Sequence, residues 1–263
     1  MKYHLWLDAA LYVIVFLLIQ FLTSMAVMYF FPDFQVNVTA LTLAAAVSSV
    51  VIVATFAALR WSPFSRLYLQ SRPWTALCWV AVLTVGTVIP SIWLSEQLGL
   101  DLSDEQKQMM TRLMSTPWGY LAVGIAVPLA EEMVFRGALL RTLLKVFSSE
   151  ETPRWRPWMA IILSALLFAA VHGNLAQGIH AFLIGLLLGW MYWRTDSIVP
   201  GLTLHWVNNS IAYALERIFP GIDDVRLVDL CGGSQLRVLM YVGFSLLIFF
   251  PALYQLCLRL RKK

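Results

Sequence analysis

The side chains best suited to chemistry in this chain lie inside an apolar, helix-forming stretch. Residues 118–147 read WGYLAVGIAVPLAEEMVFRGALLRTLLKVF, which is long enough to cross a membrane, with Glu131, Glu132 and Arg136 in the middle. A charge at the centre of a spanning helix costs about 2.5–3.5 kcal/mol on insertion scales. Three such residues indicate a short span whose ends snorkel, an ion pair that fixes packing, or chemistry within the membrane.

Helical spacing separates these three charges. Glu132 and Arg136 are four residues apart with the acid first, the favourable order for an ion pair. Glu131 is rotated by about 100° from Glu132 and leaves that face. Arg136 is therefore expected to neutralise Glu132, while Glu131 takes another partner. Pro128 is expected to kink the helix and start a new segment, with Glu131 in its first turn, where the helix dipole favours a negative charge.

Two later apolar segments carry polar side chains of catalytic type. Phe168 and His172 are four residues apart in SALLFAAVHGN, and His205 and Asn209 are four apart in GLTLHWVNNS. Taken singly, either pair is compatible with packing or with a hydrogen bond to a neighbouring helix. With Glu131 they make a general base, two imidazoles and an amide donor on three helices, and such intramembrane groups usually mark a functional cavity.

Other signals in these segments are weaker. No GxSxG, HExxH or intramembrane Asp pair occurs, which argues against a serine or aspartate intramembrane protease. His180 is interpreted as a packing or rim residue. Gly185 and Gly189 have the small-xxx-small spacing of a close helix–helix contact.

The elements that position these residues are membrane helices. The chain is 60% hydrophobic and 13% charged, against about 25% charged residues in soluble domains. We expect an all-α, polytopic transmembrane helix bundle with short interfacial helices, forming one domain over 1–263. Eight apolar segments are predicted: 9–31 (an uncleaved first span), 38–59, 74–95, 118–144, 157–173, 175–194, 198–219 and 236–258.

Three less apolar stretches connect these segments. Residues 61–73 mix aromatic side chains with arginines and are interpreted as an interfacial elbow. Residues 96–117 are expected to hold a short amphipathic helix capped by Ser103, and the acidic, Gly-rich residues 220–235 are expected to form a loop.

The basic residues predict the orientation of the bundle. With eight spans, thirteen lysines and arginines fall on one side: Lys2, Arg60, Arg66, Arg72, Arg141, Lys145, Arg154, Arg156, Arg194, Arg259, Arg261, Lys262 and Lys263. Five fall on the other: Lys107, Arg112, Arg217, Arg226 and Arg237. Both termini are therefore expected in the cytoplasm. Because these residues flank apolar runs, the net charge of +4 indicates no nucleic-acid partner.

The cysteines indicate neither a metal site nor a disulfide framework. Cys78, Cys231 and Cys257 lack metal-ligand spacing, and two of them fall in or at the end of spans.

In order and spacing, the polar motifs resemble those of a known family. Glu131-Glu132-Met-Val-Phe-Arg136 matches EExxxR, residues 168–172 match FxxxH, and residues 205–209 match HxxxN. The set, over a catalytic core of about 118–213, is similar to the CAAX prenyl endopeptidase and bacteriocin-processing (Abi, CPBP) family of intramembrane proteases. The N-terminal spans (9–95) and the last span (236–258) carry no motif of that family.

The resemblance implies roles for these side chains. Glu131 would activate a water, and His172 would assist it. His205 and Asn209 would bind the oxyanion. Glu132, Arg136 and Phe168 would be supporting residues. Family members are commonly labelled metalloproteases. Two alternatives stay open: no cofactor, or one divalent metal such as zinc on Glu131, His172 and His205, with His205 then a ligand and not an oxyanion donor.

The expected function is that of an intramembrane endopeptidase. Its partners would be membrane lipid and a peptide or lipidated-protein substrate. Prenylated CAAX processing, removal of a bacteriocin leader and general membrane-protein processing all fit the motifs. The alternatives are a non-catalytic immunity or scaffold protein, and a small transporter that uses the same polar cluster.

The predicted helix ends create a conflict of depth. His172 lies at the outer end of its segment, whereas His205 lies about 10 Å from the cytoplasmic end of its own, at 1.5 Å per residue. The two imidazoles can meet only if the 157–173 helix stops short or the Gly173–Asn174 break lies deep in the protein.

Overall fold

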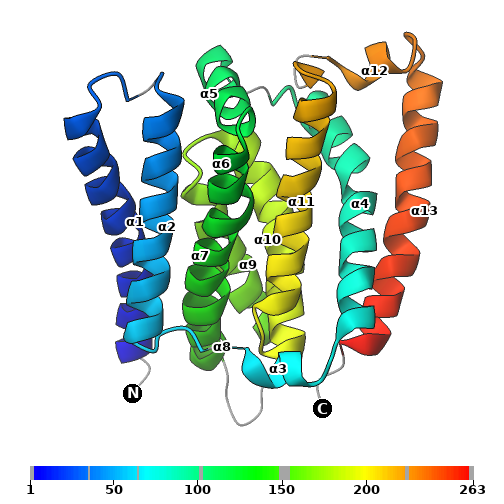
Figure 1. The fold of residues 1–263 in the computed structure, drawn as a ribbon. Coiled ribbons are helices and arrows are strands. Elements are labelled where there is room, and N and C mark those ends of the chain that lie inside the picture. The colour runs from blue at the N-terminus through cyan, green and yellow to red at the C-terminus, as the bar shows by residue number, and fades with distance from the viewer. Residues whose placement is uncertain are drawn as a thin grey trace.

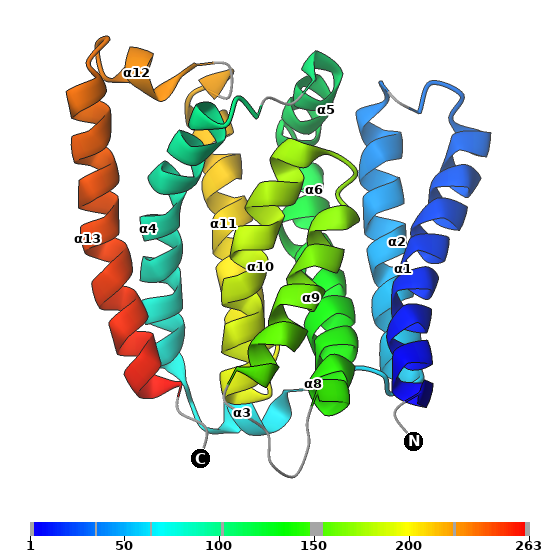
Figure 2. The ribbon, with the colours of Figure 1, turned by 180° about the vertical axis from the view of Figure 1, so that it is seen from behind.

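The computed structural model describes residues 3–34, 36–63, 65–100, 103–147, 155–222 and 225–260, and within these ranges it is helical without strands. The all-α prediction is confirmed. α1 and α2 form one flank of the bundle and α4 and α13 the other, with the 117–147 helix and α11 between them and α9 and α10 behind (Figures 1 and 2).

Each of the eight predicted segments corresponds to a helical stretch. These are α1 (Tyr3–Phe30), α2 (Val38–Ala58), α4 (Trp74–Gln97), the continuous run from α6 (Pro117–Gly119) through η1 (Tyr120–Ala126), α7 (Val127–Glu132) and η2 (Met133–Leu140) to α8 (Arg141–Phe147), then α9 (Arg156–Ala170), α10 (Leu175–Thr195), α11 (Val199–Ile218) and α13 (Gln235–Arg259).

Five of the helices in the described ranges are long and apolar enough to cross a membrane: α1, α2, α4, α10 and α13. α9 is apolar but has only 15 residues. The 117–147 run and α11 carry the motif residues Glu131, Glu132, Arg136, His205 and Asn209, and His172 follows α9. The five long apolar helices make the chain an integral membrane protein.

Pro128 does not restart the central helix, and the prediction that Glu131 lies in a first helical turn is wrong. Ala126, two residues before Pro128, keeps helical dihedrals (φ −70°, ψ −44°), and Glu131 is the fifth residue of α7. The backbone instead widens to π-helix on both sides of α7, in η1 and η2. A π register tolerates the proline without a break in the helix.

The α9–α10 turn resolves the conflict of depth. α9 ends at Ala170 and spans about 22 Å at 1.5 Å per residue, short of the roughly 30 Å hydrocarbon core. Gly173 takes φ +72°, and the Asn174 side chain accepts a hydrogen bond from the Gln177 N–H to cap α10. Figure 2 shows this turn well below the ends of α2 and α13. His172 packs on the buried Phe168 ring and interacts electrostatically with Glu131, so both imidazoles reach the same region.

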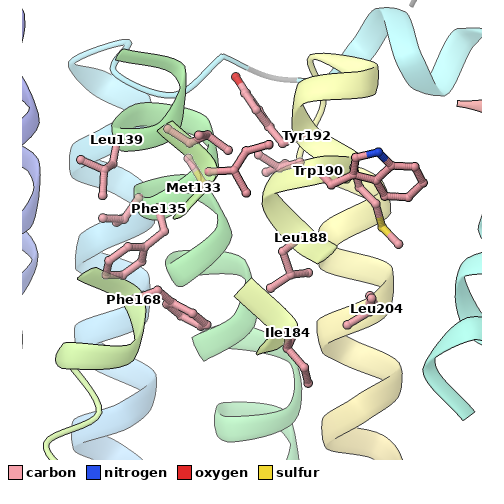
Figure 3. Packing of buried hydrophobic residues seen from close by; sticks show 14 of the residues in the cluster. Met133, Phe135, Leu139, Phe168, Ile184, Leu188, Trp190, Tyr192 and Leu204 are labelled. Atoms are coloured by element: carbon pink, nitrogen blue, oxygen red, sulfur yellow. The ribbon is translucent and has the colours of Figure 1, made fainter. Parts of the chain in front are cut away.

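One apolar core joins the central helices. Phe135 packs edge to face on Phe168, with ring centroids 5.1 Å apart, and η2, α9, α10 and α11 all supply core residues (Figure 3). The predicted close contact on α10 is confirmed: a Cβ on Gly185 would lie 3.1 Å from Ala165, and one on Gly189 would lie 2.9 Å from Ile161. Small residues let α9 and α10 approach closely.

Short helices lie at the ends of the bundle. α3 (Arg66–Gln70) lies within the 61–73 elbow, which is tied to α11 because the Ile198 N–H donates to the Ser65 hydroxyl at 3.2 Å. α5 (Asp104–Met114) has the predicted Ser103 cap as a full capping box with Gln106.

The 220–235 loop prediction is wrong in part, because α12 (Leu227–Leu230) lies within it. The Glu96 carboxylate accepts a 2.6 Å hydrogen bond from the Leu227 N–H. This tertiary cap on a four-residue helix is not readable from local sequence.

Candidate active site

Glu132 and Arg136 form the predicted ion pair and seal it from solvent. The Arg136 guanidinium donates to the Glu132 carboxylate at 2.9 Å. The Arg136 side chain is 1% exposed and the Glu132 side chain 0%. The Phe168 ring lies 4.3 Å from the guanidinium carbon, a cation–π contact. Glu132 Oε2 lies against Gly201, where a Cβ would approach it to 2.6 Å. The pair is thus enclosed by α7, η2, α9 and α11.

Glu131 faces a different partner and is less enclosed. Its carboxylate lies 3.6 Å from His205 Nε2, and both side chains are 11% exposed. The two neighbouring acids differ in this residual exposure, because the Glu132 side chain has none. Glu131 is therefore the more accessible of the two carboxylates.

His205 lies between the two carboxylates. Its Nδ1 is 3.5 Å from Glu132 Oε1, while its Nε2 faces Glu131. The 100° rotation between Glu131 and Glu132 spreads them to the two edges of one imidazole. Helical spacing alone indicated separate surroundings for the two acids, and this shared histidine is a feature that the sequence did not reveal.

His172 lies in the turn that ends α9. Its Nδ1 is 2.8 Å from the Phe168 carbonyl, which can only accept, so Nδ1 carries the proton and Nε2 is the acceptor of the neutral imidazole. The Phe168 ring contacts both imidazoles edge to face, with centroids 5.0 Å from His172 and 6.0 Å from His205. Phe168 thus packs against both histidines.

Asn209 bridges α11 to the central helix. Its side-chain amide donates to the Val123 carbonyl at 3.1 Å, and its Oδ1 accepts from Asn208 at 3.3 Å. These two bonds fix which end of the amide is the donor. Because Nδ2 carries two N–H groups, one remains for another acceptor.

His180 lies nearer the cluster than its interpretation as a packing or rim residue suggests. It interacts with the Asn208 amide and electrostatically with His172 and His205. The turn after His172 reverses the chain and brings the second turn of α10 back towards α9. His172 and His205 interact electrostatically with Glu131, and His180 interacts with these two histidines in turn. The sequence signal for His180 was a histidine that follows a helical turn within an apolar segment.

Within the described ranges, no three side chains of His, Cys, Asp or Glu are arranged to hold a metal ion. Of the predicted zinc ligands, Glu131 lies 3.6 Å from His205 Nε2, and His172 uses its Nδ1 for the Phe168 carbonyl, which leaves its Nε2 as the nitrogen that a metal would take. The zinc alternative stays a prediction. The cysteines Cys78, Cys231 and Cys257 are free thiols.

An apolar groove lies on the helices that carry Glu131 and His205. It has a volume of about 260 Å³ and lies between the central helix and α11, lined by Ile125, Leu129, Val199, Leu202, Thr203 and Trp206. Leu129 and Trp206 are close in sequence to Glu131 and His205. The groove therefore runs along the two helices that carry the partly exposed acid and imidazole.

Fold and site together define a multi-pass helical membrane protein with a polar cluster of Glu131, His172 and His205 inside its bundle, while the predicted fourth residue, Asn209, bonds the central helix at Val123. Residues 113–211 match the family model described as type II CAAX prenyl endopeptidase Rce1-like. This match confirms the predicted resemblance to the CAAX prenyl endopeptidase family of membrane proteases over the residues that carry the motifs. The chain matches no curated protein and no solved structure.

Proposed function

We propose that this protein is an intramembrane endopeptidase that hydrolyses a peptide bond with a water activated by Glu131 and His172. The observation that carries the proposal is the contrast between two adjacent acids. Glu132 is sealed in an ion pair with Arg136, whereas Glu131 is partly exposed beside His205 and on the family-matched segment. Packing alone gives no reason to keep a second, unneutralised carboxylate there.

The mechanism begins with proton transfer. Glu131, assisted by the Nε2 acceptor of His172, takes a proton from water as the oxygen attacks the scissile carbonyl carbon. The carbonyl π electrons move to oxygen, and the resulting oxyanion accepts hydrogen bonds from the second Asn209 N–H and from His205. The tetrahedral intermediate then collapses as the C–N bond breaks, and the held proton passes to the leaving amine. Each preorganised donor of this kind contributes about 2.7–4 kcal/mol to transition-state stabilisation.

The substrate approaches from the lipid side. The groove between the central helix and α11 is lined almost entirely by apolar side chains, and Ile125 and Trp206 at its surface are exposed. Such a surface fits a membrane-associated, lipidated or small hydrophobic peptide and offers nothing to a nucleic acid. Membrane lipid and such a peptide are the proposed partners.

The proposed orientation places both termini in the cytoplasm. α1 begins and α13 ends at the end of the bundle that also carries α3 (Figure 1). Arg60, Arg66, Arg72, Arg141, Lys145, Arg156, Arg194 and Arg259 belong to this end by chain order, and the positive-inside rule assigns such an end to the cytoplasm. Lys2, Arg154 and 261–263, which also entered the predicted count, lie outside the described residues.

The test of the proposal is cleavage by purified protein in liposomes. Fluorogenic hydrophobic peptides, including a farnesylated one with a CAAX-type C-terminus, are offered to wild type, Glu131→Ala and His172→Ala. Wild type is expected to cleave at least one of them, and both variants are expected to fold and to be inactive. A Glu131→Ala protein that cleaves at the wild-type rate would overturn the proposal, whereas a non-catalytic scaffold predicts no cleavage by any of the three.

A further inference from the structure

The π-helical turn before Pro128 leaves one backbone carbonyl without its helical donor. The Val127 N–H donates to the Ala122 carbonyl five residues back, the π register. The next donor in this register would be residue 128, and its acceptor would be the carbonyl of Val123. Proline has no N–H, so the Val123 carbonyl receives no hydrogen bond from position 128.

The Asn209 side chain supplies the missing donor. Its amide crosses from α11 to reach the Val123 carbonyl at 3.1 Å. In a membrane an unpaired backbone carbonyl is costly, and a side chain from a neighbouring helix is one of the few remedies. Pro128 thus leaves the Val123 carbonyl free as an acceptor, and this is the carbonyl to which Asn209 donates.

A second polar contact holds the same two helices one turn away. The Tyr120 hydroxyl lies 2.9 Å from the Ser210 hydroxyl and accepts a 2.9 Å hydrogen bond from the Trp206 indole N–H. Gly124 makes room for this ring, because a Cβ there would lie 2.5 Å from it. These bonds hold α11 against η1. Within that contact, the hydrogen bond to the Val123 carbonyl orients the side-chain amide of Asn209.

We propose that Pro128 is a positioning residue of the active site. By withholding an N–H from the Val123 carbonyl, it turns this carbonyl into an anchor for the Asn209 amide, whose second N–H is then held towards the cluster. Asn208, which donates to Asn209 Oδ1, prevents the amide from flipping. The role of the second N–H as an oxyanion donor rests on the function proposed above, whereas the Pro128–Val123–Asn209 linkage does not.

The linkage is tested by thermal unfolding in detergent micelles, without any substrate. Asn209→Ala strands the Val123 carbonyl and is expected to lower the midpoint by about 2–4 °C. Pro128→Ala returns an N–H at position 128, so Asn209→Ala in that background is expected to cost less than half as much. Pro128→Val, which returns the same N–H at similar volume, serves if the alanine variant does not fold.

The matched control is Pro90→Ala, which returns an N–H to a proline inside α4. The cost of Asn209→Ala is expected to be unchanged in that background, because Pro90 lies on a different helix from Val123. Equal costs of Asn209→Ala in the wild-type, Pro128→Ala and Pro90→Ala backgrounds would overturn the linkage.

Kinetics test the catalytic consequence. Pro128→Ala is expected to lower kcat by about 10- to 100-fold with KM nearly unchanged, and adding Asn209→Ala should lower it little further. A Pro128→Ala enzyme with wild-type kcat would overturn the positioning role. If the unfolding cycle shows the coupling and wild type cleaves nothing, the linkage stands and the proposed protease function fails instead.

Discussion

Glu131 and Glu132 are the same residue type at adjacent positions, and their surroundings give them different work. Glu132 shares a sealed site with Arg136 and lies against Gly201 on α11. Glu131 keeps 11% exposure beside His205. In a membrane interior, Arg136 offsets the burial of Glu132, whereas Glu131 has no such cation and faces the imidazole of His205. This difference is the basis of the role proposed for Glu131.

Removal of Glu132 is expected to damage folding before chemistry. Glu132→Ala leaves the Arg136 guanidinium buried without its counter-ion, which costs about 3–5 kcal/mol. Thermal unfolding in micelles measures the loss, and the paired change Glu132→Leu with Arg136→Met should recover most of it, since no charge is then stranded. A Glu132→Ala protein as stable as wild type would show that the ion pair does not hold this region.

The motifs predicted the local pairs but not how they meet. Glu132–Arg136, Phe168–His172 and His205–Asn209 follow from a spacing of four residues within one helix. The position of His205 between both carboxylates, the approach of His180 and the Val123–Asn209 bond all depend on contacts between helices. Such contacts depend on how helices pack, which helical spacing in the chain does not encode.

Helices near the site are fixed by close backbone contacts as well as by polar bonds. α9 stops after 15 residues so that its turn brings His172 into the bundle. α4 packs against both α11 and α13, so the α4–α13 flank supports the helix that carries His205 and Asn209. The eight apolar segments predicted this helix order well. The π-helical turns around α7 are associated with Pro128, and the short α12 is capped by the distant Glu96. Local helix propensity predicts neither.

Gly86 offers a test of that flank. A Cβ there would lie 2.8 Å from the backbone nitrogen of Phe249 on α13, and backbone cannot move aside as a side chain can. Gly86→Ala is expected to destabilise the protein by about 1–3 kcal/mol through overpacking, measured by thermal unfolding. Gly243→Ala on α13 is the control, because its Cβ would meet nothing within 4 Å. Equal effects of the two changes would contradict the described α4–α13 contact.

The molecule as a whole is a bundle whose flanks are apolar and whose middle is polar. The flanking helices α1, α2, α4 and α13 are apolar along their length, while the charged cluster lies on the central helices that they enclose. Within this bundle Glu131 keeps partial exposure while Glu132 and Arg136 are sealed. The proposed function requires that a hydrophobic substrate reach Glu131 from the lipid.

The proposed orientation predicts a labelling pattern. In cells expressing a cysteine-free variant, a membrane-impermeant maleimide added outside is expected to label Glu105→Cys on α5 and not Ser71→Cys after α3, since these residues lie at opposite ends of the bundle (Figure 1). Both side chains are exposed. Labelling of Ser71→Cys alone would reverse the orientation.

The most direct measurement of the central claim is cleavage and peptide binding by Glu131→Gln in liposomes. The amide keeps the shape of the carboxylate, with one oxygen acceptor and an NH2 donor in place of two acceptors, but it cannot take a proton from water. We expect Glu131→Gln to bind the peptide with wild-type affinity and to cleave at least about 100-fold more slowly, the scale of general-base catalysis. Cleavage at the wild-type rate by this variant would contradict the assignment of Glu131 as the base.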